Sequence, residues 1–146
     1  MAMAILQQRA DAAGMAIEVS SAGTHDWQTG RPAHPHTIAE LSAHGIELDH
    51  AARTFHADDF ADVDLVLAMD ARNAGDLRRL APTRGARAKI YLIRDFDPSR
   101  PHDREVPDPY YGGPGDYQRV FDMLDAASAG LIARIRTGGP PPWTHP

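Results

Sequence analysis

The sequence predicts an α/β fold of three layers, in which a doubly wound parallel sheet carries helices on both faces. Compact apolar runs at residues 65–69 and 89–93 are typical of strands buried on both faces, and helical patterns alternate with them. A third run, Ile17–Val19, alternates between apolar and polar residues as a strand does. The chain opens on a helical pattern, where a βαβ unit would open on a strand. We therefore expect the first strand of this sheet to be missing.

Helices are expected where good helix formers lie between start and stop signals. Residues 2–13 are rich in Ala, Leu and Gln, and Gly14 follows at the usual stop position. Residues 116–136 repeat apolar side chains at helical spacing, which predicts one long amphipathic helix. The expected order is helix 2–13, strand 17–19, helix 36–43, strand 65–69, helix 73–80, strand 89–93 and helix 116–136.

The composition is that of a single globular domain. The 146 residues are 42% hydrophobic and 24% charged, with a formal net charge of −5. This mildly acidic balance argues against nucleic acid and anionic lipid as partners, and no stretch is long enough to cross a membrane. We expect one domain over residues 1–136, a flexible Pro-rich tail over residues 137–146, and a cytoplasmic location.

The chain contains no cysteine. This excludes disulfides, thiolate zinc sites, iron–sulfur clusters and a cysteine nucleophile within these residues. His34 and His36 lie two residues apart, but a proline separates them and no carboxylate or thiolate partner is evident. We therefore expect neither a metal nor a cofactor.

A loop rich in Asp and Pro, residues 94–115, holds the most distinctive motif, Val106-Pro-Asp-Pro-Tyr-Tyr-Gly-Gly113. Two prolines stiffen the backbone on either side of Asp108. Tyr110 and Tyr111 would partly desolvate its carboxyl group and favour the protonated form that a general acid needs. Composition alone favours the alternative, a Pro/Gly turn whose tyrosines cover the core.

Two further segments follow strand-like runs, at the edge of a parallel sheet where ligands bind. Val19–Trp27 offers hydroxyl groups that could support a phosphate-binding loop, although by itself the segment favours an ordinary turn after a strand. Asp70 closes the apolar run 65–69, where it either faces a ligand or caps the next helix.

In this order the segments resemble the low-molecular-weight protein tyrosine phosphatase family, from residue 1 to about residue 136. The resemblance rests on four runs, of which the last is highly specific: Ser21-Ala-Gly-Thr24; Gly45-Ile46 with His50-Ala-Ala-Arg53; Asp64-Leu-Val-Leu-Ala-Met-Asp70; and Val106–Gly113. It implies a flavodoxin-like fold and hydrolysis of a phosphotyrosine protein or a small aryl phosphate.

The resemblance also implies roles for individual residues. Asp108 corresponds to the general acid that protonates the leaving tyrosyl oxygen and later helps to activate water. Trp27, Tyr110 and Tyr111 correspond to the aromatic walls of the substrate slot. Ser21, His50 and Asp70 resemble residues that surround the family's phosphate loop.

That phosphate loop has the pattern Cys-x5-Arg in the family, and neither its nucleophile nor its arginine maps onto a residue here. As written the chain is therefore expected to be inactive. We expect a normal phosphatase whose start was placed at an internal methionine, or else a truncated, noncatalytic binding protein. An arsenate reductase relative is a weaker alternative, because such enzymes use further cysteines downstream. The sequence does not indicate an oligomeric state.

Overall fold

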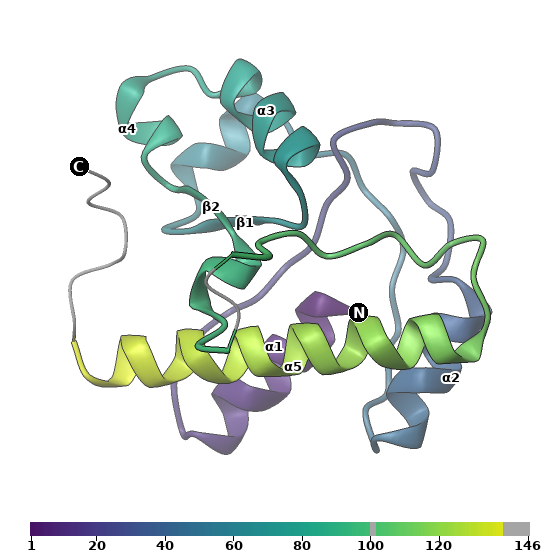
Figure 1. Cartoon of the computed structure of the whole chain (residues 1–146). Coiled ribbons are helices and arrows are strands. Elements are labelled where there is room, and N and C mark those ends of the chain that lie inside the picture. Colours follow the sequence, from purple (N-terminus) through teal and green to yellow (C-terminus); the bar gives the residue numbers. More distant parts are fainter. Residues whose placement is uncertain (100–101, 139–146) are drawn as a thin grey trace.

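The computed structural model describes residues 1–99 and 102–138 (Figure 1). Most of the expected tail, from residue 139 onward, therefore lies outside the described residues. The helices are α1 (Ala2–Ala12), α2 (Pro35–Ala43), α3 (Ala71–Leu80), α4 (Arg84–Arg87) and α5 (Pro114–Arg136); the 3-10 helices are η1 (Ala57–Ala61) and η2 (Ile93–Phe96); and the strands are β1 (Val66–Ala68) and β2 (Ile90–Leu92).

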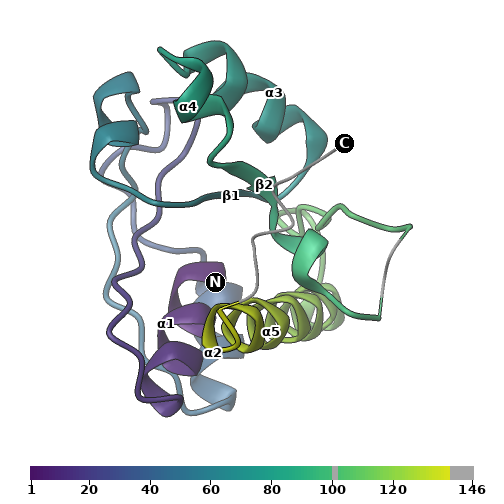
Figure 2. The same cartoon turned by 90° about the vertical axis from the view of Figure 1, so that its left-hand side faces the viewer.

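The sheet separates two helical layers. Strands β1 and β2 are parallel, with Val66 opposite Ile90 and Ala68 opposite Leu92. Helices α3 and α4 lie on one side of the sheet, and α1, α2 and α5 lie on the other (Figure 2). The predicted three-layer α/β class is confirmed.

Helix α5 is central to the helical layer that it shares with α1 and α2. Its apolar residues are buried along one face, as their spacing predicts, and Pro114 occupies the first turn, where its missing N–H costs nothing. One core cluster joins this face to α1, α2 and η2: Ala4, Ile5, Leu41, Ile46, Ile93, Val106, Val120, Phe121, Leu124 and Ala127. The long helix is thus the surface on which these shorter elements assemble.

The expected strand Ile17–Val19 is the main difference from the sequence prediction. Its side chains alternate between partly buried and exposed, but it belongs to no strand of the structure. A strand needs a neighbour with which to exchange hydrogen bonds. Here the side chain of Gln7 takes part of that role, since it donates to the Ile17 carbonyl and accepts from the Val19 N–H, at 2.9 and 3.0 Å.

Several short helices also escaped prediction. Thr83 caps helix α4, since its hydroxyl accepts the Ala86 N–H at 3.0 Å, and η2 occupies the start of the expected loop at residues 94–115. Single turns of this length carry too little periodicity to be recognised in a sequence.

Gly130 of α5 packs closely against the backbone of Phe96 in η2. A Cβ atom at this position would overlap the carbonyl oxygen of Phe96. We expect Gly130→Ala to lower the free energy of unfolding by about 1–3 kcal/mol, the usual cost of overpacking, as measured by urea denaturation. Gly115 of the same helix has open space around it, so Gly115→Ala should stabilise the protein by about 0.5 kcal/mol. Equal effects of the two substitutions would contradict the close approach.

Candidate active site

The loop that carries Asp108, here called the acid loop (residues 105–113), is tied to the end of β1. The Val106 N–H donates to the Met69 carbonyl at 2.9 Å, and the Val106 side chain is buried in the core. The Glu105 carboxylate accepts the N–H of Ala71, the first residue of α3, at 2.9 Å. The loop is therefore held across the carboxyl end of the strand.

A buried arginine holds the start of the acid loop through a hydrogen bond to its backbone. Arg94 of η2 is 3% exposed, and its Nη1 donates to the Glu105 carbonyl at 3.2 Å. The guanidinium also pairs with Asp97 at 3.3 Å and with Asp103 at 2.9 Å. Because these partners precede Asp108 in the chain, one buried cation fixes the backbone that leads to it.

Asp108 itself lies at the exposed tip of the acid loop. Its Oδ1 accepts the Tyr110 N–H at 3.0 Å, which holds the carboxyl group in a tight turn between the two prolines. The expected desolvation by the tyrosines is not seen, because Asp108 is exposed and Tyr111 is 98% exposed. The alternative that the tyrosines cover the core is also wrong, since Tyr110 is 44% exposed.

The ring of Tyr110 belongs to an aromatic cluster beside the acid loop. It meets His34 edge-on with the ring centres 5.3 Å apart, and His34 in turn stacks on the buried Tyr117. Burial raises the pKa of the Tyr117 hydroxyl, and the neighbouring Asp108 adds to the increase. His34 also caps α2, because its Nδ1 accepts the His36 N–H at 3.2 Å. One side of the Tyr110 ring is thus packed against His34, which is itself fixed by the buried Tyr117 and by α2.

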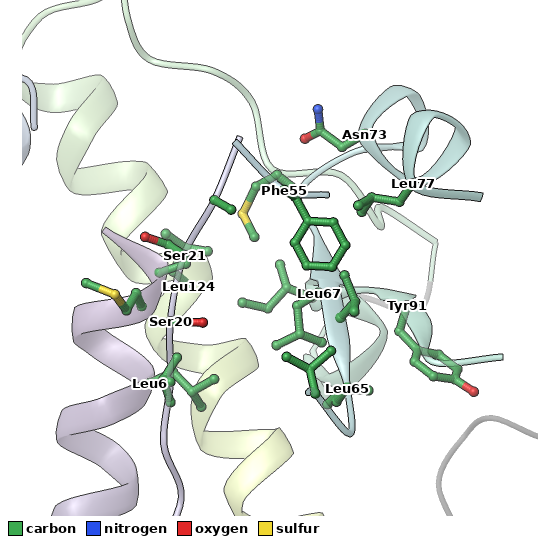
Figure 3. Close-up of a pocket in the computed structure, with 18 of the residues that line it drawn as sticks. Leu6, Ser20, Ser21, Phe55, Leu65, Leu67, Asn73, Leu77, Tyr91 and Leu124 are labelled. Carbon is green, nitrogen blue, oxygen red and sulfur yellow. The ribbon is translucent and has the colours of Figure 1, made fainter. Parts of the chain in front are cut away.

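Three of the predicted site residues border one cavity. Ser21, Asp70 and Asp108 all contribute to its lining, together with Asn73. Figure 3 shows Ser21 and Asn73 among the lining residues. The Asp70 carboxylate accepts the Asn73 N–H at 2.7 Å, so it caps α3 and borders the cavity as well. Both of the roles considered for Asp70 are therefore compatible with its position.

The structure does not bring the remaining predicted residues into this cavity. Trp27 is 66% exposed and stacks on His25, with ring centres 4.4 Å apart. His50 is partly buried beside an isolated bridge between Pro32 and Ala51. Within the described residues, Trp27, His50, Tyr110 and Tyr111 are not part of the cavity lining.

Sequence reasoning missed two polar residues that shape this region. Arg94 is the first residue of a polar loop in the sequence and shows no local sign that it is buried. Arg53 lies in one of the runs that carry the family resemblance, but that run by itself does not predict its pairing with Asp59 at 3.0 Å. Hydrogen bonds from the His56 N–H and from Arg53 lower the pKa of Asp59. The acidic pair Asp58-Asp59 was the available signal for this interaction.

Within the described ranges, no group of three His, Cys, Asp or Glu side chains is arranged to hold a metal ion. None of the helices in these ranges combines the length and the apolar character needed to span a membrane.

Known proteins resemble this chain along most of its length. The family model described as "Low molecular weight phosphotyrosine protein phosphatase" matches residues 1–139. A low molecular weight protein-tyrosine-phosphatase of Streptomyces coelicolor is 46% identical over 139 residues, covering 93% of this chain and 85% of the relative.

Solved structures show the same similarity. A protein tyrosine phosphatase from Entamoeba histolytica, crystallised with Hepes in its active site, matches with a TM-score of 0.88 and 29% identity, covering 94% of this chain and 88% of the other. YfkJ from Bacillus subtilis matches with a TM-score of 0.85 and 32% identity, covering 94% and 86%.

Removal of the buried cation should loosen the acid loop. We expect Arg94→Met to cost about 3–5 kcal/mol of unfolding free energy, because it leaves the buried Asp97 carboxylate without its partner. Hydrogen exchange at the Val106 amide should accelerate. Arg9 is a matched control, since its side chain is 42% exposed and that of its partner Asp125 is 33% exposed, so Arg9→Met should cost less than about 1 kcal/mol. Similar losses for both variants would argue against the anchoring role.

Asp97 should make the protein sensitive to acid. Burial raises its pKa, but hydrogen bonds from Ser99 and Arg94 outweigh burial and hold the pKa below its ordinary value. The stabilisation is therefore present above about pH 4 and is lost as the pH falls through the lowered pKa. Urea unfolding between about pH 3 and pH 6 should show a shallower loss for Asp97→Asn than for the natural chain. Asp122→Asn, at an exposed position of α5, should leave the profile unchanged.

Proposed function

The chain belongs to the low molecular weight phosphotyrosine protein phosphatase family, and we propose that its acid loop serves the hydrolysis of phosphotyrosine or a small aryl phosphate. The observation that supports this most directly is the position of Asp108. A stiffened, anchored loop presents its carboxyl group at the cavity edge that Ser21 and Asp70 also border.

In the proposed reaction a cysteine thiolate attacks phosphorus, and the bond between phosphorus and the aryl oxygen breaks. Asp108 donates its proton to that oxygen, so the product leaves as a neutral phenol. Water then attacks the cysteinyl phosphate and gives a proton to Asp108, which frees the thiolate and releases phosphate. The same side chain acts first as an acid and then as a base.

The aromatic side chains would contact the ring of the substrate. The ring of Tyr110 packs at a steep angle against His34 and is partly exposed, so its free surface can pack against a flat aryl group. Trp27 offers a second exposed aromatic surface, already paired with His25. In this proposal Ser21 and Asp70 support the phosphate site through hydrogen bonds.

This chain contains no cysteine, so it supplies no thiolate for the first step. We therefore expect the chain as given to show no turnover of aryl phosphates. Activity should depend on a Cys-x5-Arg loop that provides the nucleophile and an arginine for the phosphoryl oxygens.

The general acid is tested in a form of the protein that carries a strand and a Cys-x5-Arg loop ahead of Met1. In this form Asp108→Asn should lower kcat on phenyl phosphate by about 10²–10⁴-fold with little change in KM. The loss should be much smaller on p-nitrophenyl phosphate, whose leaving group needs less protonation. The exposed Asp122→Asn serves as the control.

An unchanged rate of Asp108→Asn on phenyl phosphate would refute the assignment of the acid. Arsenate turnover by this form without phosphatase activity would instead support the reductase alternative. Turnover of phenyl phosphate by the chain as given would contradict the need for a thiolate.

A further inference from the structure

The helical layer formed by α3 and α4 carries a concentration of basic side chains. Residues 71–89 contain six Lys or Arg and a single acidic residue, Asp76, whereas the whole chain contains 15 basic and 20 acidic side chains. Both helices belong to this segment, and they lie on the side of the sheet away from α1, α2 and α5 (Figure 2). The segment is therefore a basic region in a chain that is otherwise acidic.

Four exposed arginines lie together where α3 ends and α4 begins, and are here called the arginine surface: Arg78, Arg79, Arg84 and Arg87. The Arg87 Nε donates to the Arg78 carbonyl at 3.3 Å, which brings α4 against the last turn of α3. Arg84 and Arg87 are three residues apart in a single helical turn, so their side chains are neighbours. The four cations therefore form one patch.

Carboxylates compensate these cations only in part. Arg79 pairs with Asp76, whereas Arg78, Arg84 and Arg87 have no carboxylate within ion-pair distance among the described residues. Like charges that lie close together repel each other, and protein surfaces normally intersperse both signs. The arginine surface therefore lowers the stability of the chain unless an anion covers it.

Helix stability explains only half of this arrangement. Arg78 and Arg79 occupy the last turn of α3, where the partial negative charge of the helix end favours cations. Arg84 is the first residue of α4, and the partial positive charge of that end favours an anion instead. A requirement for helix stability would not select Arg84, whereas a requirement to bind an anion would.

Carboxylates near the arginine surface limit the size of an anionic partner. Lys89, which follows α4, donates through its Nζ to the carbonyls of Phe60 and Val63 at 2.6 and 2.7 Å. These bonds place the exposed Asp62 and Asp64 beside the basic region. A nucleic acid duplex or a membrane presents negative charge over a wide area and would also approach these carboxylates. A short acidic segment of a polypeptide can contact the arginines alone.

A partly apolar hollow at the end of α3 indicates what accompanies the acidic groups. Its volume is about 440 Å³, and Arg79 and Leu80 line it together with Phe55 and His56. Leu80 is 37% exposed, and the Phe55 ring packs edge-on against the buried Phe60 with ring centres 5.0 Å apart. One apolar side chain of a polypeptide can therefore be buried against Leu80 and Phe55 while its acidic neighbours contact the arginines.

We propose that the arginine surface and this hollow bind a short acidic segment of a partner polypeptide, in which glutamates or aspartates flank one large apolar side chain. The apolar side chain enters the hollow beside Leu80. The carboxylates pair with Arg78, Arg84 and Arg87, since a planar guanidinium group can hold a carboxylate through two parallel hydrogen bonds. This interaction requires none of the residues assigned to the proposed reaction.

A synthetic peptide tests this proposal. It has about eight residues, with one leucine at the centre and glutamates on both sides, and is at most about 27 Å long when extended. Calorimetry with the full chain at low ionic strength should show saturable binding of one peptide per chain. A version with glutamine in place of every glutamate should bind about tenfold more weakly or worse. Binding of the glutamate peptide should weaken as salt is added, because exposed charges are screened.

Matched charge reversals locate the arginine surface. Arg84→Glu combined with Arg87→Glu should weaken binding of the glutamate peptide by about tenfold or more. Arg119→Glu combined with Arg136→Glu makes the same change of net charge at exposed positions of α5, and should alter the affinity by less than about twofold. If the reversal in α4 prevents folding, as judged by circular dichroism, Arg84→Gln combined with Arg87→Gln replaces it and should also weaken binding.

The hollow is tested by a pair of changes, one on each side of the contact. Leu80→Ser should weaken binding of the leucine peptide by about fivefold to tenfold, because less apolar surface is buried. The same variant should bind a peptide with serine in place of leucine as well as the natural chain does. Equal effects of Leu80→Ser on both peptides would contradict the contact between leucine and the hollow.

Three results would overturn the proposal: no binding of the glutamate peptide, equal binding of its glutamine version, or equal weakening by the reversals in α4 and α5. A single-stranded oligonucleotide, and vesicles of phosphatidylcholine and phosphatidylglycerol in equal parts, are tested alongside. If one of these binds through α4 and the peptide does not, the surface belongs to nucleic acid or to a membrane instead. Asp108 takes no part in these measurements, so their failure and the failure of the proposed reaction are distinguishable.

Discussion

The burial of one face of α5 is the constraint on which the rest of this structure depends. Leu124 and Ala127 are almost completely inaccessible, and they pack in one cluster with Ile5 of α1, Leu41 of α2 and Ile93 of η2. Each of these shorter elements is too small to bury its own apolar residues. Since area removed from water is the main stabilising contribution, the long helix determines where each of them lies.

The same core also fixes the position of the acid loop. Val106 is buried in the α5 cluster, and its N–H donates a hydrogen bond to the Met69 carbonyl just after β1. The Arg94 guanidinium donates a hydrogen bond to the carbonyl of the preceding residue, Glu105. Asp108 lies only two residues after Val106, between prolines. The start of the acid loop is therefore fixed in the core, whereas Asp108 is exposed. This allows the Asp108 carboxyl group to contact a ligand at a defined position without being buried itself.

The edge of β1 that faces away from β2 contrasts with this packing. Two extended stretches, β1 and residues 17–21, border one cavity, and among the described residues β1 pairs with β2 alone while residues 17–21 belong to no strand. The side chain of Gln7 forms hydrogen bonds with backbone groups on only one edge of residues 17–21. This explains why an alternating sequence at Ile17–Val19 gives extended backbone but no strand: alternation specifies which side chains are buried, whereas a strand also requires a partner.

Local signals in the sequence determined the longer helices α1, α2, α3 and α5, the two buried strands and the motif around Asp108. Gly14 and Gly45 have positive φ angles of 67° and 73° where the first helices end, and Pro107 and Pro109 stiffen the acid loop wherever it lies. Only the tertiary structure decided that Arg94 is buried, that Ser21, Asp70 and Asp108 share a cavity, and that Tyr111 faces solvent. The reason is physical: backbone preferences act over a few neighbouring residues, whereas burial and juxtaposition depend on which distant elements pack together.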